Sequence, residues 1–130
     1  MLLTTTLTSA AAAAIINIWL SIRCGQVRTK QSISIGHGGS EVLERRMRAQ
    51  LKFAENTPWV LALIAALELA EKGGLWLPYV AGIYMLGRIA HGVGMDGTNL
   101  AKGRMIGTLT TMFTQLGLAV VATLVATGVM

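Results

Sequence analysis

The sequence predicts an all-α integral membrane protein, a four-helix bundle, and three observations point to it. Hydrophobic residues make up 53% of the 130 residues and charged residues only 13%, about half the fraction expected of a soluble domain. The mean hydropathy is +0.59. Four segments are each long enough, at about 1.5 Å per residue, to cross a hydrocarbon core of ~30 Å. We expect a single domain over residues 1–130.

The first expected helix covers about residues 1–22, which hold no charged side chain. A cleaved signal peptide is the alternative for this segment. Against it, no Lys or Arg precedes the apolar region, and the bulky side chains of Ile15, Ile16 and Trp19 follow the alanine run. We therefore expect a membrane-spanning helix here.

The second helix is expected over residues 41–70, because Ser40 followed by acidic residues is typical of a capped helix start. The glycine-containing stretch QSISIGHGGS before it, residues 31–40, is predicted to be a flexible turn. Gly73 and Gly74 then form a tight link to a third helix over 75–95. The fourth helix, 104–130, carries no charge after Arg104.

The net charge of +5 and the pI near 10.0 would ordinarily suggest a nucleic-acid partner. The basic residues instead fall beside the expected helix ends, so we predict no nucleic-acid binding. Short loops rich in Lys and Arg stay in the cytoplasm. The first and third connections should therefore be cytoplasmic and both termini extracytoplasmic. The basic residues at these two connections are Arg23, Arg28, Lys30, Arg45, Arg46, Arg48, Lys102 and Arg104, whereas the second connection has only Lys72.

Some charged residues interrupt the apolar segments, where each costs about 2.5 to 3.5 kcal/mol at mid-bilayer. Arg48, Lys52 and Glu55 share one face of the second helix, and Arg88 and His91 share one face of the third. With Arg104 they can converge on one polar pocket that opens to the cytoplasm. The alternative is structural: Lys52 snorkels, Glu55 pairs with Arg48 or Arg88, and the set locks the helices together.

Other motifs carry little chemistry. His37, His91 and Cys24 lack a metal-ligand spacing, so we predict no metal site. The pair Gly103 and Gly107 indicates close approach of another helix. Asn17 is expected to form an interhelical hydrogen bond, and Pro58 to kink or loosen the second helix.

Residues 44–58, ERRMRAQLKFAENTP, resemble the pattern E-R-x-x-R-A-x-x-N-x-x-E-Y-x-P of the membrane-associated proteins in eicosanoid and glutathione metabolism, the MAPEG family. The G-x-G-G turn at 36–39, a G-R-x-x-H motif late in the third helix and R-x-x-G at the start of the fourth agree with it. The resemblance covers nearly the whole chain and is to bacterial-type members. It implies an inner-membrane location and a homotrimer.

In this family glutathione, as co-substrate, lies between neighbouring subunits near the cytoplasmic face. The resemblance implies that Arg48 holds a glutathione carboxylate, with Arg28 as a further carboxylate contact. Gln50 would reach the ligand of the adjacent subunit, and Glu55 would take the ammonium group. These charges complement a tripeptide with two carboxylates and one ammonium.

For catalysis, the resemblance makes Arg104 the first candidate to stabilise the glutathione thiolate and Arg88 the second. His91 would donate a hydrogen bond to glutathione. Two positions of the binding set depart from the family pattern: Lys52 replaces Asn, and Asn56 replaces a Tyr found in many members. Lys52 can still donate hydrogen bonds, but its charge can instead neutralise Glu55.

These features favour a glutathione-dependent membrane transferase or peroxidase that acts on small lipophilic electrophiles taken from membrane lipid. The alternative is a non-catalytic lipid-binding or scaffold protein of the same fold. A small multidrug exporter is a third interpretation. It is the weakest, because such exporters use a carboxylate in the first helix and this helix has none.

Overall fold

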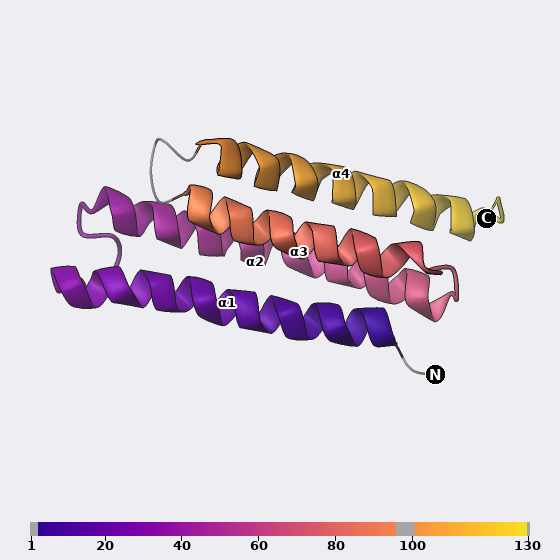
Figure 1. The fold of residues 1–130 in the computed structure, drawn as a ribbon, viewed down its shortest axis with the longest axis horizontal. Coiled ribbons are helices and arrows are strands. Elements are labelled where there is room, and N and C mark those ends of the chain that lie inside the picture. The colour runs from indigo at the N-terminus through magenta and orange to yellow at the C-terminus, as the bar shows by residue number, and fades with distance from the viewer. Residues whose placement is uncertain (1–2, 96–100, 130) are drawn as a thin grey trace.

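The computed structural model describes residues 3–95 and 101–129, without the side chains of residues 101 and 102. Four α-helices lie side by side along the long axis of the molecule, and the chain runs up and down through them (Figure 1). This arrangement confirms the all-α, four-helix prediction. The helices are α1 (Thr4–Gln31), α2 (Glu41–Leu69), α3 (Trp76–Gly94) and α4 (Ala101–Ala126).

Helix α1 is longer than its apolar segment. It continues past Ile22 to Gln31 and ends at Ser32, whose φ of 57° is left-handed. Arg28 and Lys30 lie in its last turn, where cations interact favourably with the negative end of the helix dipole. An apolar run measures the length of chain suited to hydrocarbon, whereas the helix ends where its backbone hydrogen bonds end. The apolar run therefore did not predict this boundary.

Helix α2 begins as the sequence predicts. The Ser40 hydroxyl accepts a hydrogen bond from the Leu43 amide at 3.3 Å, and Glu41 and Glu44 occupy the first turn. The helix then continues as one element through Pro58. Because proline has no amide proton, the Ala54 carbonyl loses its usual partner there.

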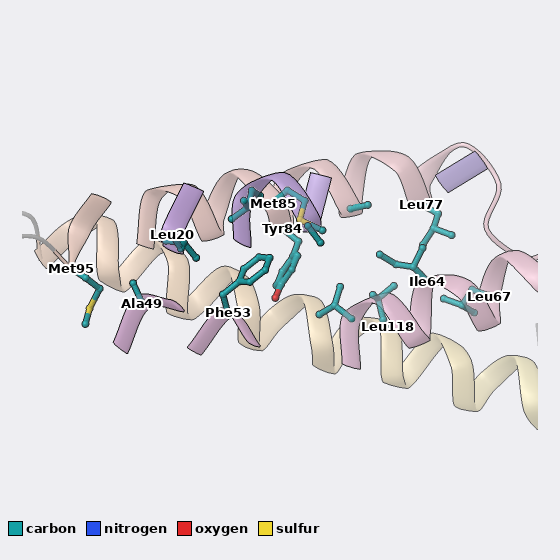
Figure 2. Close-up of a cluster of buried hydrophobic side chains, with 14 residues drawn as sticks. Leu20, Ala49, Phe53, Ile64, Leu67, Leu77, Tyr84, Met85, Met95 and Leu118 are labelled. Atoms are coloured by element: carbon teal, nitrogen blue, oxygen red, sulfur yellow. The ribbon is translucent and has the colours of Figure 1, made fainter. Parts of the chain in front are cut away.

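The core runs along the inside of the bundle, with the ring of Tyr84 near its middle (Figure 2). All four helices contribute to it, and its most buried side chains include Leu20, Ile64, Leu77, Tyr84 and Leu118. A second, smaller cluster of Cys24, Val27 and Leu43 packs near the first connection. Helix α3 packs most extensively on α4, and α1 packs on α2.

Large apolar side chains also cover the outside of the bundle. Within the residues that the structure describes, two helices, α1 and residues 103–126 of α4, are long and apolar enough to cross a membrane. Only 28% of the residues in the most apolar stretch of α1, and 11% of those in α4, are buried in the bundle. Their apolar surfaces are therefore largely exposed, unlike those of a core helix in a soluble protein. Helices α2 and α3 carry the charged residues that interrupt their apolar segments. Exposed apolar side chains on α1 and α4 include Leu7, Ile15, Ile18, Leu109, Phe113, Leu116 and Val120.

Candidate functional site

A groove of about 730 Å³ runs between α1 and α2 at the end of the bundle that holds the first connection, residues 32–40. Three of the predicted binding residues line this α1–α2 groove: Arg28 from α1, and Arg48 and Gln50 from α2. The helical ends that meet here are the C-terminus of α1 and the N-terminus of α2. The groove is therefore lined by the most basic part of the chain.

Gln50 is held against α1 by hydrogen bonds. Its side-chain amide donates to the Ser21 hydroxyl and, at 3.5 Å, to the side-chain oxygen of Asn17. The Cys24 thiol lies 3.9 Å from the side-chain oxygen of Gln50. Asn17 thus makes the interhelical hydrogen bond that the sequence predicts, with Gln50 as its partner. Gln50 faces α1 and not the outer surface of α2.

Arg28 and Arg48 lie on opposite walls of the α1–α2 groove. Arg28 is part of α1. The sequence instead predicts a place for it in the first connection, beyond the expected end of this helix. Its guanidinium donates to the Gly36 carbonyl at 2.8 Å, which ties the connection to the helix. Arg48 forms a 3.6 Å ion pair with Glu44 one turn earlier, yet its side chain remains 64% exposed. Arg48 is therefore free to contact an anion in the groove.

The outer face of α2 carries a second hollow, of about 470 Å³, shared with α4. Glu55, Asn56 and Trp59 line it from α2, and Gln115 lines it from α4. We call it the α2–α4 hollow. The Asn56 amide donates to the Lys52 carbonyl at 2.8 Å, and the Gln115 amide donates to the Asn56 carbonyl at 3.1 Å.

The expected ion pairs of Glu55 do not form. Its carboxylate is exposed, and within residues 3–95 and 101–129 no ion pair includes it. Arg48, the first expected partner, pairs with Glu44 instead, because the two lie four residues apart on one helix. Arg88, the second, lies inside the bundle and is only 3% exposed. The structural alternative for Glu55 is therefore wrong in the single chain.

Arg88 and His91 form a buried polar pair between α3 and α4. Arg88 donates to the Thr111 hydroxyl at 2.9 Å, and another of its nitrogens lies 3.5 Å from Nδ1 of His91, which is 2% exposed. Arg48, Lys52 and Glu55 face outward, so the two predicted stripes do not share one pocket. Besides Arg88 on its own helix, Lys52 from α2 and Arg104 from α4 act electrostatically on His91.

Arg104 is half-buried in the first turns of α4, between Gly103 and Gly107, where this helix lies close to α3. A Cβ atom at Gly103 would lie 2.8 Å from the Ala90 carbonyl oxygen, and one at Gly107 would collide with Cβ of His91. The glycine pair thus permits close helix approach, as predicted.

The nine predicted residues therefore occupy three places around α2 and α3. Some line the α1–α2 groove, some lie on the outer face of α2, and the rest belong to the contact between α3 and α4. Sequence reasoning missed Ser21, Thr111 and Gln115, which hold Gln50, Arg88 and Asn56. Their polar side chains within apolar helices are the signal that could have identified them.

The comparison with protein families gives one result. The model described as "MAPEG family" matches residues 6–124 of the chain. Comparison with curated proteins and with solved structures gives no match.

Proposed function

The chain belongs to the MAPEG family, an integral membrane family, and we propose that it is a glutathione-dependent transferase or peroxidase. The family includes such enzymes as well as non-catalytic members. The proposed second substrates are small lipophilic electrophiles dissolved in the membrane. The attacking group is the thiolate of glutathione, because the neutral thiol is a weak nucleophile.

The observation that carries the proposal is the charge pattern on α2. Arg48 has a largely exposed guanidinium and Glu55 an exposed carboxylate without an ion pair among the described residues. They lie on one helical face, two turns apart. Glutathione has two carboxylates and one ammonium, so a ligand bound along this face finds an opposite charge at each end. An exposed, unpaired carboxylate at membrane depth is costly without such a ligand.

The distribution of the set around α2 supports a site between copies of the chain. Arg28 and Gln50 belong to the α1–α2 groove, whereas Glu55 and Asn56 belong to the α2–α4 hollow. These two surfaces lie on either side of the face of α2 that carries Arg48 and Glu55. In the proposed homotrimer a neighbouring subunit packs against this face, and glutathione lies between the two subunits.

Arg104 is the proposed activator of the thiol, whose reference pKa is about 8.5. A guanidinium near the sulfur favours the anion and lowers that pKa. Arg104 is half-buried at the edge of the bundle, whereas Arg88, the second candidate, is buried inside it. Arg104 is therefore better placed to meet a ligand on the outer surface.

The test is conjugation of glutathione to an aromatic halide by the purified protein in detergent. We expect Arg104→Ala to lower turnover about tenfold near pH 7, which corresponds to a thiol pKa raised by about one unit. Since the thiol ionises unaided at higher pH, the deficit should shrink as the pH rises through 8.5 and above. Thermal melting checks that the variant is folded.

Arg45→Ala is the matched control, because Arg45 pairs with Glu41 and lines neither the groove nor the hollow. It should leave turnover unchanged. If glutathione neither binds nor raises the melting temperature, the proposal is wrong.

The non-catalytic scaffold is the second candidate function. Lys52 and Asn56, which replace the Asn and Tyr of the family pattern, favour it because they alter the contacts around Glu55. Glutathione binding without turnover on any electrophile would support this alternative.

A further inference from the structure

The contact between α3 and α4 contains a buried cation that the proposed chemistry does not use directly. Arg88 is 3% exposed, and its two described hydrogen-bond partners are Thr111 on α4 and His91 on its own helix. Its Nε atom is buried and has no partner within the described part of the chain. Burying a guanidinium is costly unless it is hydrogen-bonded. The hydrogen bonds of Arg88 therefore favour the helix arrangement in which they can form.

Thr111 connects Arg88 to the backbone of α4. Its hydroxyl accepts from Arg88 at 2.9 Å and donates to the Gly107 carbonyl at 2.8 Å. Gly107 itself is pressed against His91 and the Gly87 carbonyl of α3. The Thr111 hydroxyl thus links the Arg88 guanidinium of α3 to the Gly107 carbonyl of α4.

This connection constrains the rotation of α4 about its axis. Glycines permit close approach, but they have no side chains with which to set a rotational angle. The Arg88–Thr111 hydrogen bond is directional, because an N–H donor loses strength steeply when it is misaligned. Thr111 therefore has to face α3.

Arg104 lies on the same face of α4 as Thr111. The two are seven residues apart, close to two full turns of helix, so their side chains leave the helix in nearly the same direction. Arg104 is half-buried and acts electrostatically on His91, together with Arg88 and Lys52. The rotation that aligns Thr111 with Arg88 is thus the rotation that turns Arg104 toward α3.

We infer that Arg88 and Thr111 are positioning residues, which orient Arg104 through the rotation of α4. Arg88 acts from within the bundle and does not contact the sulfur of glutathione. The role of Arg104 toward the thiolate rests on the proposed function, whereas the control of its orientation by Thr111 does not.

The first experiment compares Thr111→Val with Thr111→Ser and Thr108→Val. Valine keeps the shape of threonine but removes the hydroxyl, serine keeps the hydroxyl, and Thr108 is an exposed threonine on the same helix. The readout is the pH titration of bound glutathione, followed by the ultraviolet absorbance of its thiolate. We expect Thr111→Val to raise the apparent pKa of the thiol by about one unit, a tenfold loss of thiolate below that pKa.

The same variants separate a positioning role from a general loss of structure. Thr111→Val should lower kcat and leave the KM for glutathione within about twofold, because the binding contacts on α2 are unchanged. Thr111→Ser and Thr108→Val should match the unaltered protein in thiol pKa, kcat and KM. If Thr111→Val has a normal thiol pKa although Arg104→Ala raises it, or if Thr111→Ser raises the thiol pKa as Thr111→Val does, the inference is wrong.

The second experiment needs no glutathione. In a Cys24→Ser background, Arg104→Cys introduces a single thiol whose reaction with a water-soluble maleimide reports the direction in which position 104 faces. Adding Thr111→Val should change the labelling rate about threefold or more, because thiol reactivity follows exposure and local charge. Adding Thr108→Val should not change it. Equal rates in all three proteins would overturn the positioning inference even if glutathione binds, and a change caused by Thr111→Val alone would support it even if glutathione does not bind.

Discussion

Thr57 and Tyr84 show how a single polar contact is held inside this bundle. Their hydroxyl oxygens lie 2.9 Å apart between α2 and α3, and the two residues are 3% and 0% exposed. Thr57→Val removes one hydroxyl with little change of shape and leaves the other without its partner. A buried polar group that loses its partner costs about 1 to 3 kcal/mol. We expect a lower free energy of unfolding by that amount, measured by thermal melting in detergent.

Tyr84→Phe provides the second side of a double-mutant cycle. In the double variant no polar group is left unpaired, and replacing both partners by apolar groups can be nearly neutral. Thr57→Val with Tyr84→Phe should therefore cost less than the sum of the single changes. Additive losses would mean that the two hydroxyl groups do not stabilise each other.

At the scale of elements, α1 depends on another helix for its N-terminal cap. Its N-cap residue, Leu3, has no capping side chain, and the carboxylate of Glu68 on α2 accepts from the amides of Thr5 and Thr6, both at 2.8 Å. Glu68→Gln leaves one acceptor oxygen and places the side-chain NH2 group, a donor, against the other backbone N–H. We expect a loss of about 1 kcal/mol and faster hydrogen exchange at the first turn of α1.

Glu71→Gln is the matched control for this cap, because Glu71 is exposed in the link between α2 and α3 at the same end of the bundle. Only Glu68→Gln should speed the exchange of the Thr5 and Thr6 amides. Equal exchange in both variants would show that Glu68 does not cap α1.

The elements could largely be predicted from the sequence, but the direction in which their polar faces point could not. Ser40 and the pair Gly103 and Gly107 carry local signals, a cap and a small-residue spacing, that act over a few residues. The spacing of Arg48 and Glu55 predicts that they share a face of α2. It does not predict whether that face is inward, because in a membrane protein the outside is as apolar as the core. The structure turns this face outward and turns Arg88 inward.

At the scale of the whole molecule, charge is separated along the bundle. The C-terminal end of α1 and the N-terminal ends of α2 and α4 lie together at one end, with most of the basic residues, while the link between α2 and α3 lies at the other (Figure 1). The α1–α2 groove opens at the basic end. The positive-inside rule therefore predicts that the proposed glutathione site lies on the cytoplasmic side, where this charged tripeptide needs no transport to reach it.

This orientation can be tested with two single-cysteine variants in a Cys24→Ser background. Ser34→Cys lies in the first connection and Lys72→Cys in the link between α2 and α3; both positions are exposed, and neither lines the α1–α2 groove. In intact bacterial cells, an impermeant maleimide should label the cysteine at position 72 and should reach that at position 34 only after permeabilisation. The Cys24→Ser protein without an added cysteine gives the background. Labelling of position 34 in intact cells would show that the topology is the opposite of the predicted one. The basic end would then face away from the cytoplasmic supply of glutathione that the proposed reaction requires.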